Sequence, residues 1–141
     1  MGIKDRIAEI VERFNKHSDQ EDRYKELIKL GKELPKDENL EQRDELLIRG
    51  CQSQVWLNAK LDGDKIIFSA ESDALITRGI VALLLFVYSG ATIDEILSTK
   101  PDFLEEIGIR EHLSMNRSNG LAAMLKQITI YAMAFKAKQS I

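Results

Sequence analysis

The sequence predicts an α+β protein, in which a small antiparallel sheet of about three strands packs with N-terminal helices and is followed by a helical C-terminal half. Three observations lead to this fold class. Apolar residues recur at helical spacing over residues 3–14, alternate over 55–61 before an Asp-Gly-Asp turn, and fill 74–88 almost without interruption. At 141 residues, the chain 1–141 is predicted to form one domain with a substantial core.

The first part of the chain predicts two amphipathic helices. The apolar stripe of the first helix comprises Ile3, Ile7, Ile10, Val11 and Phe14. Residues 18–21 are typical of a capping box, in which Ser18 caps the second helix and Glu21 reaches back. Pro35 ends that helix. One face of the second helix carries Tyr24, Leu27, Ile28 and Leu34. The charged residues 36–44 predict a surface loop.

The sheet is predicted from three short segments. Residues 46–48 are a candidate short strand that leads to the cysteine. Residues 55–61 alternate as a strand does, and residues 65–70 return as its partner after the turn at 62–64. Trp56 is expected in the core or in the wall of a pocket.

The second half of the chain predicts helices. Ser72 or Asp73 is expected to cap a helix over 74–88 that is apolar all round, is therefore buried, and ends at Gly90. Residues 92–95 form another capping box that opens a short helix, and 101–107 predict a further one. The last helix is expected to start near Ser114 and run towards Lys138. Its core stripe comprises Leu121, Met124, Leu125, Ile128, Tyr131 and Phe135.

Composition argues against several functional classes. The net charge is −3, and no basic patch with interleaved aromatic residues is present, so we expect no nucleic-acid partner. The most apolar stretch, 79–88, is too short to cross a bilayer, and the N-terminus lacks the pattern of a secretory signal. The single cysteine fits a reducing compartment. We therefore predict a cytoplasmic protein without a membrane partner.

Cys51 is the most informative residue, because it is the only cysteine and follows a glycine. Glycine has no Cβ to shield its neighbour, so the thiol is placed where another molecule can reach it. One thiol cannot supply the several thiolates of a zinc or iron–sulfur site. It can pack, act as a nucleophile or carry a group.

Residues 50–56, Gly-Cys-Gln-Ser-Gln-Val-Trp, resemble the signature of the SufE family, the sulfur-acceptor partners of cysteine desulfurases. Three further segments, 30–35, 72–79 and 117–121, resemble family segments in the same order, so the resemblance covers almost the whole chain. It implies the SufE-like fold, to which U-type iron–sulfur scaffolds are similar.

The resemblance also implies a function. Cys51 would accept persulfide sulfur from a SufS-type cysteine desulfurase that depends on pyridoxal phosphate, stimulate that enzyme, and pass the sulfur to an iron–sulfur assembly scaffold. The protein itself would not be a stand-alone enzyme and would need no cofactor and no metal. It is expected as a monomer or weak homodimer.

Several residues are candidates to support the thiol. The backbone at Gly50, the side chains of Gln52, Ser53 and Gln54, and the guanidinium of Arg117 could stabilise the anionic thiolate and persulfide. Arg117 is also compatible with a solvated surface residue. Asp73 either caps the long helix or holds a loop beside Cys51 or meets the desulfurase.

Three alternatives remain open. The sulfur could be delivered to another pathway such as RNA modification. A U-type scaffold would build the cluster itself, but it needs about three cysteine ligands. A cysteine hydrolase would need His17 or His112 within hydrogen-bond reach of Cys51. We also expect the thiol to tuck against apolar residues and to swing out on docking, with Gly50 as a hinge.

Overall fold

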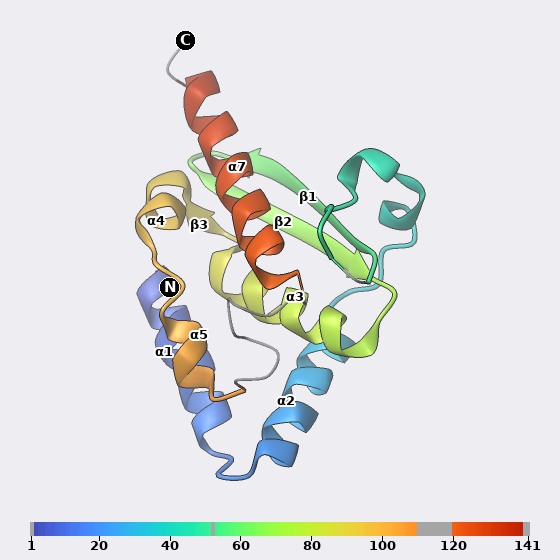
Figure 1. The fold of residues 1–141 in the computed structure, drawn as a ribbon. Coiled ribbons are helices and arrows are strands. Elements are labelled where there is room, and N and C mark those ends of the chain that lie inside the picture. Colours follow the sequence, from blue (N-terminus) through green and yellow to red (C-terminus); the bar gives the residue numbers. More distant parts are fainter. Residues whose placement is uncertain (1, 52, 110–119, 140–141) are drawn as a thin grey trace.

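The computed structural model describes residues 2–51, 53–109 and 120–139, and confirms the α+β class with a three-stranded antiparallel sheet (Figure 1). The first half contains α1 (Ile3–Asn15), α2 (Gln20–Glu33), the 3₁₀ turns η1 (Leu40–Gln42) and η2 (Asp44–Leu46), β1 (Val55–Asp62) and β2 (Lys65–Ser72). The second half contains α3 (Leu75–Tyr88), β3 (Ala91–Thr92), α4 (Ile93–Ser98), α5 (Phe103–Ile107) and α7 (Leu121–Gln139).

The sheet has the order β1-β2-β3. The hairpin turn is confirmed: Asp62 pairs with Lys65, and Gly63 adopts the positive φ of 64° that this two-residue turn requires. The predicted third strand was wrong. Leu46 lies in η2, and Leu47 forms only an isolated bridge with Trp56. The third strand is instead β3, where the chain returns from α3 and pairs with the start of β2.

The core lies on one face of the sheet, where α3 and α7 cover it (Figure 1). The alternation predicted for β1 places Val55 and Leu57 on this face, beside Ile66, Phe68 and Ala70 of β2. The helix α3 is buried along most of its length, as its uniformly apolar sequence predicts. From α7, the Tyr131 hydroxyl donates to the carbonyl oxygen of Leu57 over 2.7 Å.

The opposite face of the sheet is covered at one end by the strap, our name for residues 36–48. Leu40 and Leu46 of the strap pack on Trp56, which is only 5% exposed. Trp56 is therefore a core residue, as expected. The predicted surface loop at 36–44 is correct for its charged residues but not for Leu40, because this leucine covers the indole.

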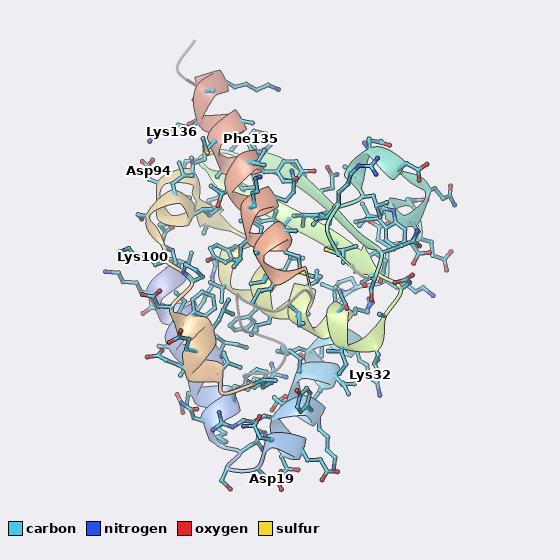
Figure 2. The ribbon with its side chains drawn as sticks, in the orientation of Figure 1. Asp19, Lys32, Asp94, Lys100, Phe135 and Lys136 are labelled. Atoms are coloured by element: carbon cyan, nitrogen blue, oxygen red, sulfur yellow. The ribbon has the colours of Figure 1, made fainter. Side chains whose placement is uncertain are left out.

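Local caps account for several helix boundaries. The helix α2 is capped by Asp19, whose carboxylate accepts from the backbone N–H of Glu21 over 2.7 Å; the predicted Ser18 cap was wrong. Figure 2 labels Asp19 at the tip of the α1–α2 hairpin. The capping box of Thr92 and Glu95 at α4 is confirmed, with hydrogen bonds of 3.0 and 3.1 Å.

The helix α7 begins at Leu121 rather than near Ser114. Gly120 has φ of 86°, a left-handed conformation that interrupts an α-helix, and residue 114 itself lies outside the described residues. The ion pair of Asp94 and Lys136, at 3.1 Å, joins α4 to α7 (Figure 2). Among the described residues, no helix is both long and apolar enough to cross a membrane.

Candidate functional site

Cys51 lies in a short loop, residues 49–54, between the strap and β1. The base of this loop is closed where the N–H of Ile48 donates to the carbonyl oxygen of Val55 over 2.8 Å. Both closing residues are buried in the core. The thiol is therefore carried by a compact loop with an anchored base, rather than by a strand or a helix.

The first turn of α7 packs against this loop. A Cβ placed on Gly50 would lie 3.6 Å from the Cβ of Ala123, and one placed on Gly120 would lie 2.9 Å from the Cβ of Cys51. The latter distance is shorter than real Cβ atoms show, so only a glycine at 120 allows the loop this close. Gly50 itself has φ of 94°, which favours glycine. Because both positions are glycine, the Cys51 loop can pack closely against the first turn of α7.

The thiol is half-buried and donates a long, weak hydrogen bond of 3.8 Å to the carbonyl oxygen of Gly120. Burial raises the pKa of Cys51 above its ordinary value of 9.0. The N-terminal end of a helix favours an anion, but the atom that faces the sulfur here is a carbonyl oxygen, which favours the protonated thiol. In this conformation Cys51 is a neutral, weakly nucleophilic thiol.

Asp73 holds the other end of the loop. Its carboxylate accepts from the backbone N–H of Gln54 over 3.1 Å, and its own N–H donates to the carbonyl oxygen of Gln54 over 3.4 Å. The N-cap of α3 is Ala74, without a side-chain cap, so the prediction that Ser72 or Asp73 caps this helix was wrong. Asp73 instead extends the β1–β2 pairing by one residue, beside the cysteine loop.

The remaining predicted residues are placed as follows. The side chain of Ser53 is half-buried and that of Gln54 is exposed. Gln52 and Arg117 lie outside the described residues, and so does His112. His17 lies in the α1–α2 turn, where its Nε2 is 3.2 Å from a carboxylate oxygen of Glu26.

Two features were missed by sequence reasoning. Arg49 is exposed two residues before the thiol, and no acidic partner for it lies in the described part of the chain. The buried Glu71 and the half-buried Arg78 form an ion pair of 2.8 Å. The sequence did contain a signal for this pair: each of the apolar segments 66–72 and 74–88 carries one charged residue, and a charge inside the protein needs a partner.

The described residues contain no group of three or more His, Cys, Asp or Glu side chains that could hold a metal ion. The described residues thus place one thiol on an anchored loop and no preformed metal site beside it. In this arrangement the thiol is half-buried, and its raised pKa favours the protonated form.

Comparisons of the sequence with known proteins identify relatives of this chain. The family model of SufE, an Fe–S metabolism associated domain, matches residues 8–132. An uncharacterized SufE-like protein of Rhizobium meliloti is 41% identical over 129 residues, which cover 86% of this chain and 91% of the relative. One from Synechocystis sp. is 36% identical over 137 residues, covering 95% of this chain and 84% of the relative.

The chain belongs to the SufE family. It is thereby an accessory protein of iron–sulfur metabolism, and membership implies a cysteine desulfurase as partner. The fold is similar to the solution structure of a hypothetical protein from Thermus thermophilus, with a TM-score of 0.72, 19% identity, and coverage of 92% of this chain and 94% of the other.

The location of one plant relative is known from its name. SufE-like protein 1 of Arabidopsis thaliana, whose name places it in chloroplasts and mitochondria, is 36% identical over 135 residues. These cover 94% of this chain but 36% of the relative. The cytoplasmic location of this protein therefore stays a prediction.

Proposed function

We propose that Cys51 accepts persulfide sulfur from a SufS-type cysteine desulfurase, thereby stimulates that enzyme, and passes the sulfur to an iron–sulfur assembly scaffold. The observation that carries this proposal is the single thiol, half-buried on an anchored loop, in a chain of the SufE family. Cleavage of the carbon–sulfur bond belongs to the pyridoxal phosphate of the partner. Cys51 supplies only an acceptor.

The transfer is a thiol–persulfide exchange. The Cys51 thiolate attacks the outer sulfur of the donor persulfide, so a new sulfur–sulfur bond forms on Cys51 while the sulfur–sulfur bond of the donor breaks. The donor cysteine leaves as a thiolate and the proton lost by Cys51 passes to solvent or to the leaving group. No external oxidant or reductant is needed, because the outer sulfur keeps its oxidation state.

The resting position of Cys51 is unsuited to this attack, so the loop must open. The thiol is neutral because burial raises its pKa, and a thiolate there would face the carbonyl oxygen of Gly120. Movement about Gly50 would bring the thiol into water or into the partner. After transfer, closure would return the persulfide to the first turn of α7, away from stray thiols.

The supporting residues of the proposal are those around the loop. Backbone N–H groups near Gly50, together with Gln52, Ser53, Gln54 and Arg117, would stabilise the anionic sulfur once the loop opens. Asp73 would set how readily the loop leaves its closed position, through its two contacts with Gln54. We propose a monomer or weak homodimer, formed of one domain over 1–141, as the carrier.

The experiment is intact-mass spectrometry after incubation with a desulfurase and free cysteine. Cys51 should gain one or more sulfur atoms, reversibly with dithiothreitol, whereas Cys51→Ser should gain none and should not stimulate the desulfurase. Sulfur transfer that survives in the serine variant would end the proposal. Delivery to RNA modification requires the same loop and differs only in the recipient, whereas a cluster scaffold needs about three thiolates and the chain has one cysteine.

A further inference from the structure

We propose that the ion pair of the buried Glu71 and the half-buried Arg78 is the positioning element of the cysteine loop, because it fixes the segments that lead to both ends of that loop. This deepens the proposed function, on which only its consequence for sulfur transfer rests. Glu71 is 2% exposed and the side chain of Arg78 is 15% exposed. Moving a carboxylate and most of a guanidinium out of water is costly, so such a pair is weak evidence for added stability and suggests a positioning role.

One set of contacts of the ion pair leads to the C-terminal end of the cysteine loop, at Gln54. The Glu71 carboxylate oxygen that meets Arg78 also accepts from the backbone N–H of Ser72 over 3.1 Å. The next residue is Asp73, which contacts Gln54 through its carboxylate and its N–H. Glu71 therefore orients the end of β2 from which Asp73 holds the loop.

A second set of contacts of the ion pair leads to the beginning of the strap, at Asp37. The other carboxylate oxygen of Glu71 accepts from the N–H of Asp37 over 3.1 Å. Arg78 donates to the carbonyl oxygens of Gly31 and Leu34, over 3.0 and 2.7 Å. These bonds satisfy carbonyl groups at the C-terminal end of α2 and fix the point where the strap departs.

The strap then carries this constraint to the near end of the loop. Trp56 lies opposite Glu71 in the β1–β2 register, and Leu40 and Leu46 of the strap pack on it. Leu47 pairs with Trp56, and Ile48 closes the base of the loop. Both ends of the segment that carries the thiol are thus connected to this one ion pair.

This arrangement predicts that weakening the pair loosens the loop at both ends while the core persists. Arg78→Lys keeps the positive charge but loses the planar fork that reaches two carbonyl groups and a carboxylate at once. Glu71→Gln keeps the shape of the carboxylate and removes its charge. In both variants Cys51 should leave its contact with Gly120 more often.

Arg13→Lys is the matched control. Arg13 also bridges two glutamates, Glu26 and Glu33, each at 3.1 Å, but its bonds join α1 to α2, and none of them reaches the strap, Glu71 or Arg78. We would measure the rate of Cys51 alkylation by iodoacetamide in each folded variant, as a function of pH, and subtract the contribution of global unfolding from denaturant titrations.

Arg78→Lys and Glu71→Gln should be alkylated about tenfold faster than the wild type, which corresponds to ~1.4 kcal/mol of loop closure. Their pH profiles should move to lower pH, because a released thiol escapes burial, and Arg13→Lys should stay within about twofold of the wild type. If Arg78→Lys fails to fold, Glu71→Gln carries the test.

Alkylation rates at the wild-type level in both variants, or an equal acceleration in Arg13→Lys, would overturn the positioning role. The assay contains no desulfurase, so its outcome is independent of sulfur transfer. A Cys51 that accepts no sulfur, with alkylation still accelerated in Arg78→Lys, would retain this inference and reject the proposed function.

Discussion

Replacing Gly120 with alanine should force Cys51 out of its resting place. The new Cβ would overlap Sγ of Cys51 and lie 2.9 Å from its Cβ and 3.1 Å from its Cα. Sγ could rotate away, but the other two atoms move only with the loop. Because the 3.8 Å hydrogen bond of the thiol is weak, opening the loop relieves the overlap more readily than shifting α7 does.

The loss of stability caused by the clash with Cys51 can be separated from the loss caused by the left-handed backbone conformation of residue 120. A residue with a side chain pays ~1–2 kcal/mol in the left-handed region, and forcing extra atoms into a packed site adds ~1–3 kcal/mol. Gly63→Ala is the matched control, because Gly63 has φ of 64° but a Cβ there meets nothing within 4 Å. We expect Gly120→Ala to lose ~1 kcal/mol more unfolding free energy than Gly63→Ala, the value of one weak hydrogen bond and a half-buried thiol.

The assay combines urea unfolding with the pH dependence of Cys51 alkylation. Since burial raises the folded-state pKa of Cys51, the protonated thiol contributes stability below the ordinary value of 9.0, and this is lost as pH rises through the folded pKa. Gly120→Ala should lose this alkaline decline and be alkylated about tenfold faster near pH 8, because the released thiol is exposed and its pKa falls back towards the ordinary value. A wild-type alkylation profile together with a larger loss of stability would show that the loop stays closed, and would refute the reasoning.

Two further predictions concern single carboxylates. Asp73→Ala removes the hydrogen bond from the N–H of Gln54, which contributes ~1 kcal/mol, so the rate of hydrogen exchange over residues 49–54 should rise by about tenfold. Asp102→Ala is the control, because it removes an exposed aspartate that makes no side-chain cap contact, and the exchange rate should stay unchanged. Equal exchange in the two variants would show that Asp73 does not hold the loop. Glu95 accepts from the N–H of Thr92, the cap of α4, and from the first N–H of α1, and these bonds hold the pKa of its carboxyl below the ordinary value of 4.5. Its contribution is therefore present above pH 4.5 and is lost as pH falls through the folded pKa, so Glu95→Gln should cost ~1 kcal/mol at neutral pH and less in acid. Thermal unfolding at several pH values measures this, and a cost that does not change with pH would contradict it.

Much of the fold follows from local sequence patterns. The stripe that includes Ile10 and Phe14, the Asp-Gly-Asp turn, the apolar run of α3 and the capping box of Thr92 were each read correctly. Each depends on residues within about one or two turns of each other, where periodicity and capping act. The single thiol in its glycine-flanked segment likewise identified the candidate site and the family before any geometry was known.

The sequence did not determine which residues contact each other when they lie far apart along the chain. Asp73 resembles a helix cap locally, yet its carboxylate meets Gln54, 19 positions earlier, and the third strand forms at β3 because the chain returns from α3 to the free side of β2. The contacts of Glu71 and Arg78 with the strap and α2 span 34 to 47 positions. Local propensity carries no information about such contacts, since they exist only once the hydrophobic core has brought the elements together. The sequence by itself determined which group is the candidate acceptor, and the tertiary structure decided that this thiol rests half-buried against Gly120, on a loop held at both ends, where burial raises its pKa.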